Sequence, residues 1–459
     1  MPVTPPPAGG YPLTVDTLVI GAGACGLVAA LSAAEAGQEV LVLERDAVPS
    51  GSTALSAGLI PAAGTAQQAA AGVLDTPATF AADIQRKAHD EADPALVATL
   101  TGAAPEVIGW MTGTLGLPLT LVTDFDYPGH THRRMHGLPE RSGAALIDRL
   151  RAAAEARDIP IVCERTAHTL CTEAGEVTGV IARRPDGADE AIGCRRLILA
   201  CNGYGGNRDR VARHMPGIAE ALYFGHTGNQ GDALDWAETL GLRTAQLGAY
   251  QGHGNVAHPH GILITWAVIM EGGVQVNAEG RRFWNEAQGY SEAARAVMAQ
   301  PGGVAWAIFD DRIAGIARQF ADFQAAEAQG AIRRADTVEG LAQALGLPAD
   351  ALAETLAAAE AARGGADAFG RSFAGLPPLT PPYYGVKVTG ALFHTQGGLE
   401  VTETANAIRA DGTPMQSLFA AGGAAVGVSG SGDAGYLSGN GLLSAVVLGR
   451  IAGRQPLPG

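Results

Sequence analysis

The feature that most constrains the fold is a glycine-rich loop between an apolar run and a helical segment near the start of the chain. Residues 16–20 form the apolar run, and residues 21–26, Gly-Ala-Gly-Ala-Cys-Gly, follow at once. Residues 27–36 are rich in alanine and leucine and predict a helix, and residues 40–43 predict a second strand that ends at Glu44. This order indicates a strand–helix–strand unit of a doubly wound α/β sheet.

Each glycine of this loop has its own task in a dinucleotide-binding turn. Gly21 permits the sharp turn, Gly23 lets the backbone approach a pyrophosphate, and Gly26 lets the helix pack close to the strand. The N–H groups at the start of the helix then face the phosphates. Glu44 follows Gly26 by 18 residues, where a carboxylate accepts hydrogen bonds from ribose hydroxyls. The alternative is a structural glycine turn, but the complete strand–helix–strand context favours a dinucleotide site.

The composition indicates a large globular protein and excludes several classes. The 459 residues suffice for about three units of roughly 150 residues each. The net charge of −15 argues against nucleic acid or an anionic membrane as the main partner. No apolar run reaches the roughly 18 residues of a membrane span, and the N-terminus lacks signal-peptide features. The cysteines are scattered and form no zinc motif, so we expect a cytoplasmic protein without a metal site.

The pattern along the chain predicts two domains, one inserted into the other. Residues 1–12 are expected to be a flexible tail, and residues 13–244 the first part of the dinucleotide-binding domain. The composition shifts over 245–384, which we interpret as an inserted substrate domain, and residues 385–459 return to the first domain. Further helices are expected at 79–113, 143–157, 231–242, 313–330, 337–364 and 440–452, and further strands at 160–165, 177–183 and 195–200.

Several further segments resemble one family. The similar segments are 50–58, 197–206, 227–232, 280–286, 394–398, 418–423 and 449–453, in the family's own order. The chain thereby resembles the fumarate reductase/succinate dehydrogenase flavoproteins over nearly its whole length. The resemblance implies a doubly wound, Rossmann-like FAD-binding domain with an inserted α+β capping domain, and an active site between them.

The resemblance also implies which residues bind FAD. Ser52 stands where succinate dehydrogenases carry the histidine bonded covalently to FAD, so the flavin is expected to be non-covalent. Gly423 stands where many relatives place an acid that contacts the flavin's sugar chain, so this contact must come from elsewhere. The implied cofactor contacts are Gly21, Gly23, Ala24, Gly26, Glu44, Arg45, Ser52, Thr53, Ser56, Gly58, Ala200, Cys201, Asn202, Gly203, Asp232, Gly422, Gly423, Ser438 and Leu442.

Two departures from the family pattern concern the substrate. Tyr290 and Tyr436 stand where the dicarboxylate enzymes carry the two arginines that hold the substrate carboxylates. A desolvated carboxylate without its arginine costs roughly 3–5 kcal/mol per lost partner. Trp266 and Ile269 replace the residues of the fumarate reductases' proton path. A fumarate-like dicarboxylate is therefore disfavoured, and the substrate should be neutral, or nearly so, at its reacting end.

The tyrosines instead resemble those of the 3-ketosteroid dehydrogenases, most of all the 3-keto-5α-steroid Δ4-dehydrogenases. The resemblance implies that Tyr436 holds the ketone oxygen with backbone N–H groups near Asn440 or Gly441. Ser438, relayed through Tyr290, would take the proton next to the ketone, and hydride would pass to flavin N5. The alternatives are that Tyr290 is a packed aromatic residue and that Ser438 only caps the terminal helix. As a base, Tyr290 would need a lowered pKa or a relay partner.

Histidines supply further candidates. His394 and His253 match substrate-contacting histidines of the dicarboxylate enzymes, although a turn cap or a buried, hydrogen-bonded histidine is the alternative for each. A metal at His253, His258 and His260 is conceivable but disfavoured. The loop with Tyr127, His130, His132 and His136 could line the rim of the pocket or be solvated.

These observations predict a FAD enzyme that desaturates, or in reverse reduces, a carbon–carbon bond next to a ketone. The expected partners are an apolar cyclic ketone, such as a steroid, and an external electron acceptor or donor. One alternative is a reductase of an unsaturated acid or ketone. It would depend on a separate electron donor, because the chain has no C-x-x-C-H haem motif. A second alternative is a non-catalytic flavin-binding subunit or sensor.

Overall fold

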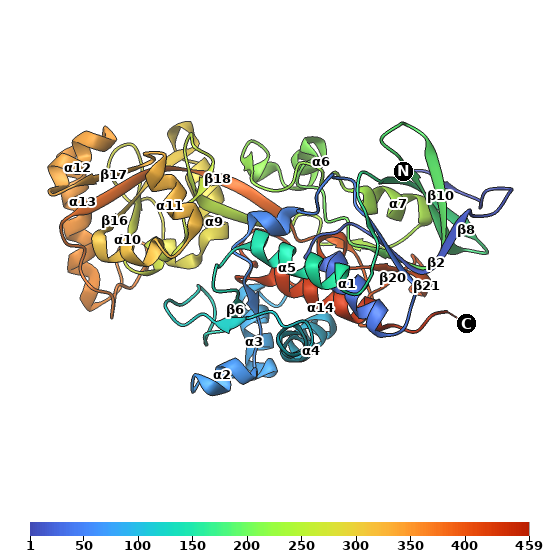
Figure 1. Cartoon of the computed structure of the whole chain (residues 1–459). Helices are drawn as coiled ribbons and strands as arrows, with labels where there is room; N and C mark the ends of the chain where they lie inside the picture. Colours follow the sequence, from blue (N-terminus) through green and yellow to red (C-terminus); the bar gives the residue numbers. More distant parts are fainter. Residues whose placement is uncertain (459) are drawn as a thin grey trace.

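The computed structural model describes residues 1–458 and shows two lobes joined by long strands (Figure 1). The larger lobe is built on a nine-stranded sheet whose main order is β1-β8-β9-β10-β2-β3-β7, with β21 beside β10. The predicted unit is confirmed, since β2 runs parallel to both β3 and β10. The strands are β1 Val3–Thr4, β2 Leu13–Ile20, β3 Val40–Leu43, β7 Ile161–Val162, β8 Thr166–Glu173, β9 Glu176–Arg183, β10 Asp189–Leu199, β20 Asn406–Ile408 and β21 Pro414–Ala420.

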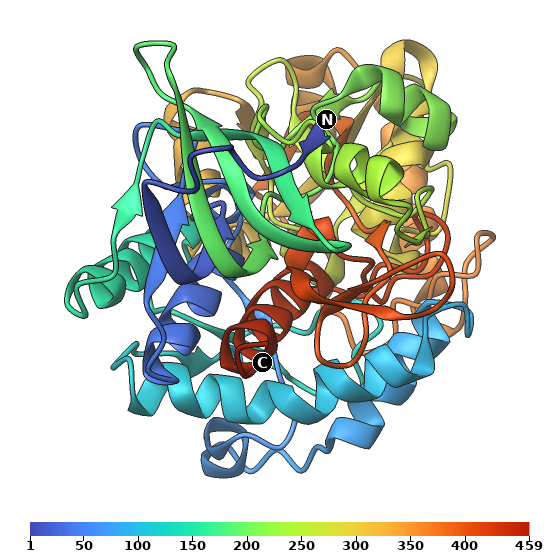
Figure 2. The ribbon, with the colours of Figure 1, turned by 90° about the vertical axis from the view of Figure 1, so that its right-hand side faces the viewer.

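Helices cover this sheet, and two of them pack unusually closely. Helix α14 (Asn440–Arg454) lies against α1 (Ala24–Glu35) and beside the long helix α4 (Pro94–Gly113), as Figure 2 shows. A Cβ atom on Gly453 would lie 2.3 Å from the carbonyl oxygen of Ala29. Only glycine permits this approach, which packs the C-terminal end of α14 against the middle of α1. The other helices of this lobe include α3 Pro77–Lys87, α5 Gly143–Glu155, α6 Arg208–His214 and α7 Asp232–Leu240.

The smaller lobe, which we call the cap, has a seven-stranded sheet with helices around it. Its main order is β14-β13-β18-β16-β15, and β11 and β17 also pair with β18. Strand β18 runs from the cap into the larger lobe (Figure 1). The elements are β11 Leu222–Tyr223, β13 Tyr250–Ala257, β14 Ile262–Leu263, β15 Val274–Val276, β16 Val304–Asp310, β17 Ile332–Ala335, β18 Tyr383–Thr395, α8 Ala267–Met270, α9 Tyr290–Met298, α10 Asp311–Ala317, α11 Ala321–Ala328, α12 Val338–Leu345 and α13 Ala349–Ala361.

The structure corrects several boundaries. The expected tail, residues 1–12, contains β1, which pairs with Leu170 and Cys171 of β8, because backbone hydrogen bonds anchor it despite its prolines. The boundary expected at 384/385 falls inside β18, a single strand shared by both lobes. The helix expected at 79–113 is broken at His89 and Asp90, whose positive φ angles end α3 before Asp93 caps α4. Similarly, Gly346 separates α12 from α13.

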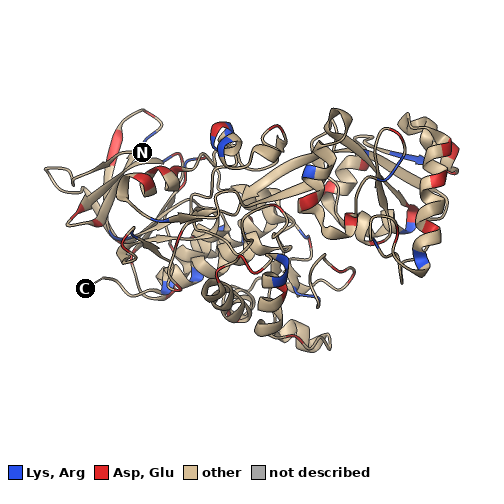
Figure 3. Cartoon of the chain, turned by 180° about the vertical axis from the view of Figure 1, so that it is seen from behind, with Lys and Arg blue, Asp and Glu red and all other residues tan. Residues whose placement is uncertain are grey.

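Figure 3 shows basic and acidic residues in both lobes. Within residues 1–458, no helix combines the length and the apolar character that crossing a membrane requires. In the same part of the chain, no group of three or more His, Cys, Asp or Glu side chains is arranged to hold a metal ion.

A buried ion cluster joins the loop before α5 to α3. Arg134 donates to both carboxylate oxygens of Asp75, with Nε–Oδ2 and Nη2–Oδ1 distances of 2.6 and 3.0 Å, and also to Asp83. All three side chains are at most 1% exposed. Burial alone would raise the pKa of Asp83, but hydrogen bonds from Arg134, Thr131 and Arg86 together lower it to about 2. Asp83 is therefore charged at neutral pH.

Replacing Arg134 by methionine should destabilise the protein by about 3–5 kcal/mol, because the buried Asp75 loses its counter-ion and Asp83 keeps only Arg86. Arg133→Met is the matched control: Arg133 pairs with Asp126 at the surface, so its loss should cost at most about 1 kcal/mol. Urea unfolding at pH 7 measures the free energy of unfolding of both variants. If both variants lost equally little stability, the ion cluster would contribute little to the stability of the protein.

Candidate active site

A cavity of about 410 Å³ lies between the two lobes and gathers most of the predicted residues. Its wall includes the tyrosine pair, both candidate histidines, Ser438, Gly441 and the predicted cofactor contacts apart from Gly26 and Gly203. The structure places Gly26, Gly203 and Asn440 behind this wall. The Asn440 amide faces Ser429 Oγ at 3.2 Å, so its side chain is directed into the protein.

The glycine loop forms one end of the cavity. Gly21 has a φ of +102°, and a Cβ on Gly26 would lie 1.8 Å from the Gly21 carbonyl oxygen, so neither position accepts a side chain without distortion. A Cβ on Gly23 would meet nothing closer than Thr53 Oγ1 at 3.8 Å. The N-cap residue Gly23 provides no side-chain cap, so the positive end of α1 and its first N–H groups are available to phosphate, apart from the Ala24 N–H, which Thr53 Oγ1 accepts. This open cradle fits the pyrophosphate of FAD.

Glu44 is held rigidly beside this loop. Its Oε2 accepts a hydrogen bond from the Ala22 N–H at 2.8 Å, and its Oε1 accepts one from the Asp46 N–H at 3.0 Å. Each carboxylate oxygen keeps a second acceptor site, so Glu44 can still accept from ribose hydroxyls. Arg165, Thr166 and Ala167 line the same end but were not singled out from the sequence. Arg165 ends the segment expected to be a strand at 160–165, whereas Thr166 and Ala167 begin β8, which was not expected.

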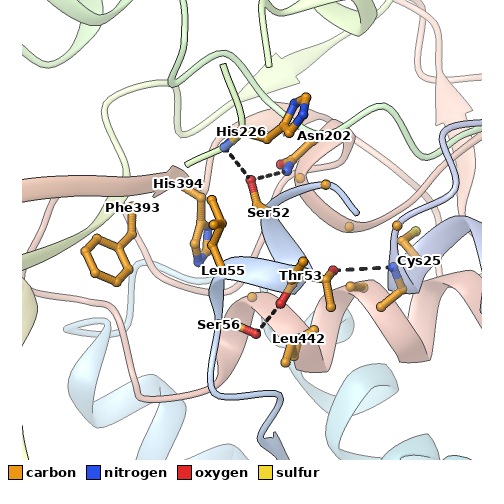
Figure 4. A pocket seen from close by; sticks show the side chains of 18 of the residues that line it. Cys25, Ser52, Thr53, Leu55, Ser56, Asn202, His226, Phe393, His394 and Leu442 are labelled. Atoms are coloured by element: carbon orange, nitrogen blue, oxygen red, sulfur yellow. Dashed lines mark hydrogen bonds between the residues drawn. The ribbon is translucent and has the colours of Figure 1, made fainter. Parts of the chain in front are cut away.

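The second cofactor loop is held by a set of hydrogen bonds around Ser52. Ser52 Oγ accepts from Asn202 Nδ2 at 3.2 Å and from the His226 N–H at 3.2 Å, both drawn in Figure 4. It also accepts from Asn229 Nδ2 at 2.9 Å. The next residue, Thr53, accepts the Ala24 N–H at 3.3 Å, which joins this loop to the start of α1. Asn229 and His226 lie in the segment 227–232 or next to it, but sequence analysis did not single them out.

The structure explains why residue 423 is a glycine and not an acidic residue. A Cβ there would lie 2.1 Å from Asn202 Oδ1. Asn202 adopts a left-handed conformation with a φ of 64°, and the same Oδ1 accepts the Gly203 N–H at 2.8 Å. The Asn202 amide thus occupies the space into which a side chain at 423 would extend. A polar group therefore remains in this region, although it comes from a different segment.

The other end of the cavity is formed by the two tyrosines, which come from different lobes. Tyr290 is the first residue of α9 in the cap, and Tyr436 precedes α14 in the larger lobe. Their ring centroids are 6.1 Å apart. The Gly441 N–H, in the first turn of α14, donates to Tyr436 Oη at 3.3 Å. The start of the helix is thus joined directly to the phenol oxygen.

The electrostatics of the two phenols follow from burial. Burial raises the pKa of Tyr436 to about 12, although the Gly441 and Gly439 N–H groups and Tyr290 lower it. Burial also raises the pKa of Tyr290 well above its usual value, outweighing the opposite effect of its contact with Ser438. Both phenols are therefore protonated donors at neutral pH. The pKa of Tyr290 is not lowered, so a role as base depends on the relay alternative.

The two candidate histidines are neutral and packed against the tyrosines. His253 stacks on Tyr290 with centroids 4.9 Å apart and on Phe393 at 5.1 Å, and burial lowers its pKa to about 3. Its Nδ1 accepts the Asn255 N–H at 3.2 Å. Burial lowers the pKa of His394 to about 4, and its ring meets Tyr436 edge-on at 5.6 Å. Phe393, which sequence analysis missed, completes an aromatic wall.

The loop that carries Tyr127 and three histidines is only partly at the cavity. Tyr127 lines it, whereas His136 is buried and lies 2.8 Å from Thr65 Oγ1. His130 Nε2 lies 3.0 Å from the Ser438 carbonyl oxygen, and its Nδ1 lies 3.3 Å from Arg134 Nη1. His130 thereby links the loop before α14 to the buried ion cluster. His258 and His260 are exposed and are not part of the cavity wall.

Comparisons with known proteins agree with this site. A family model described as "FAD binding domain" matches residues 16–442. A probable fumarate reductase of Shewanella frigidimarina is 32% identical, with 97% of this chain and 75% of that protein covered. The open conformation of a flavocytochrome c3 fumarate reductase superposes with a TM-score of 0.80 at 31% identity, covering 97% of this chain and 78% of the other. The 3-ketosteroid-Δ4-(5α)-dehydrogenase of Rhodococcus jostii RHA1 superposes with a TM-score of 0.75 at 25% identity, covering 98% of this chain and 99% of the other.

The chain therefore belongs to the FAD-binding domain family, within the flavoproteins of the fumarate reductase and succinate dehydrogenase superfamily. It is a FAD-dependent oxidoreductase that acts on carbon–carbon bonds. The expected α/β fold with a Rossmann-like FAD domain is confirmed.

Proposed function

We propose that this enzyme introduces, or in reverse reduces, a carbon–carbon double bond next to a ketone in an apolar cyclic substrate such as a 3-ketosteroid. The observation that carries the proposal is the placement of the Tyr436 phenol beside Tyr290 and at the start of α14, where the Gly441 N–H donates to Tyr436 Oη at 3.3 Å. Removing the α-proton of a ketone requires fixed donors for the developing enolate oxygen. A protonated phenol and a helix start meet that need without an arginine.

In this proposal the two lobes contribute different parts of the reaction. Tyr436 donates to the ketone oxygen, and the first N–H groups of α14 support it. Tyr290 takes the α-proton as its own phenol proton passes to the Ser438 hydroxyl, which in turn releases its proton to water, because the raised pKa keeps the phenol protonated and makes this relay necessary. His253, Phe393 and Trp266 form apolar walls that exclude water. FAD, when bound, supplies the acceptor for the hydride from the β-carbon.

A second candidate function is the reverse reaction, reduction instead of desaturation, on the same fold. Here the enzyme would reduce an unsaturated acid or ketone with electrons from a separate carrier. The identity of 32% to a probable fumarate reductase favours it. The tyrosines at 290 and 436 speak against a dicarboxylate, because neither phenol can neutralise a buried carboxylate.

An anaerobic titration of the oxidised protein separates the two candidates. We expect a saturated 3-ketosteroid to bleach the oxidised flavin band. Comparison of 5α-saturated with 4-ene steroids would then locate the new double bond. Failure to bleach, together with reoxidation of chemically reduced flavin by an unsaturated acid, would favour the reductase. No response to either class would contradict both candidates.

A further inference from the structure

Arg141 is a cationic residue on the cavity wall that the proposed reaction does not use. It lies just before α5, with Asp124 and Phe125 on one side and the cap residue Phe320 on the other. Its Cζ atom is 6.0 Å from the centroid of the Phe125 ring and 5.7 Å from that of Phe320. Its φ of +46° is unusual for a side chain of this size, and such outliers are found preferentially at functional positions.

The guanidinium of Arg141 is only partly satisfied. Nη2 donates to Asp124, whose side chain is 38% exposed. Nη1 is buried and has no partner, although an arginine N–H in such a place ordinarily finds an acceptor. A ligand oxygen in the cavity would supply that acceptor.

Arg141 lies at the substrate end of the cavity. This position follows from Tyr127, which lies near residues of both the arginine and the tyrosine pair. The ring centroids of Tyr127 and Phe125 are 4.9 Å apart, and the charges of Arg141 and Tyr436 both influence the pKa of Tyr127. The two other cationic wall residues belong to the cofactor end. Arg165 donates to Glu190 at 2.7 Å, and Arg45 lies against Gly228 near Asp232.

We propose that the substrate carries a carboxylate at the end away from its reacting ketone, and that Arg141 Nη1 binds this carboxylate. The inference rests on the proposed function and narrows its substrate class to apolar cyclic keto acids. The two ends of the cavity then differ in chemistry: neutral donors at the tyrosine pair suit a ketone oxygen, and the guanidinium suits an anionic oxygen. The carboxylate is bound but not altered, so the arginine contributes to specificity.

The test compares a 3-oxo-5α-steroid that has a side-chain carboxylate with its methyl ester. In Arg141→Gln, KM for the carboxylate should rise about 10- to 100-fold at nearly constant kcat, while KM for the ester should change less than about threefold. Arg149→Gln is the matched control, because Arg149 lies in the same region, pairs with Glu140 at the surface and is not part of the cavity wall. It should change neither constant.

A second variant and a binding measurement keep the test independent of turnover. Asp124→Asn removes the competing anion and should strengthen carboxylate binding, the opposite sign to Arg141→Gln. Dissociation constants of the two enone products, followed through the flavin absorbance of the oxidised holoenzyme, measure both effects. An equal affinity of the wild type for acid and ester, or loss of FAD from Arg141→Gln, would overturn the proposal. If neither ketone bleaches the flavin, the proposed function fails, while an acid preference lost in Arg141→Gln would still support the site.

Discussion

Replacing Tyr436 by phenylalanine should lower turnover by about 100-fold or more while FAD remains bound. The hydroxyl is the donor aimed at the proposed ketone oxygen, and deleting one such donor typically costs this much. The ring itself should stay in place, because it also packs against the rings of Tyr290 and His394, and these contacts remain when the hydroxyl is removed. The measurement is kcat with a saturated 3-ketosteroid, together with the flavin-to-protein absorbance ratio.

The matched control for this variant is Tyr11→Phe. Tyr11 also loses a hydroxyl that is hydrogen-bonded, to Thr178 Oγ1 at 2.9 Å, but it is not part of the cavity wall. Turnover should be unchanged there. Unchanged turnover in Tyr436→Phe as well would remove Tyr436 from the mechanism and leave the Gly441 N–H as the remaining donor.

Replacing Gly26 by alanine should abolish tight FAD binding, lowering the affinity by about 100-fold or more. The new Cβ would lie 1.8 Å from the Gly21 oxygen and 3.0 Å from the Gly21 carbonyl carbon, and both are backbone atoms that cannot rotate away. The loop must open to make room, which moves the N–H groups of α1 away from the phosphates. Overpacking should also cost about 1–3 kcal/mol of stability. Flavin content after gel filtration and the melting temperature are the measurements.

Gly102→Ala provides the matched glycine substitution. Gly102 lies inside α4, and its Cβ would meet no atom within 4 Å. Alanine should stabilise that helix by about 0.5–1 kcal/mol and leave FAD bound. If Gly26→Ala kept its flavin as well as Gly102→Ala does, the loop would not have the tight geometry that we assign to it.

The cofactor end could largely be predicted from the sequence, whereas the substrate end could only partly be predicted. Gly21, Gly23 and Glu44 lie within a single strand–helix–strand unit, so their spacing in the chain directly encodes their spacing in space. The tyrosine pair was predicted through a resemblance to a family. The raised pKa values of both phenols depend on burial by both lobes, which no local pattern records.

Other features depended wholly on packing. No pattern around Gly423 shows that Asn202 occupies the space of a side chain there, since the two residues come from distant segments. Arg141 likewise belongs to a loop without a motif, and its unpaired Nη1 exists only because the cap brings Phe320 against it.

The class of fold and the cofactor loop could be derived from residue types and short-range spacing alone. The positions of Tyr290 and Tyr436, where the related dicarboxylate enzymes carry arginines, came from the resemblance to a family. Only the tertiary structure decided that the two tyrosines share one cavity, that β18 crosses the expected domain boundary, and which buried groups keep their protons. Those outcomes arise from contacts between segments far apart in the chain, where burial and distance, rather than local periodicity, determine the chemistry.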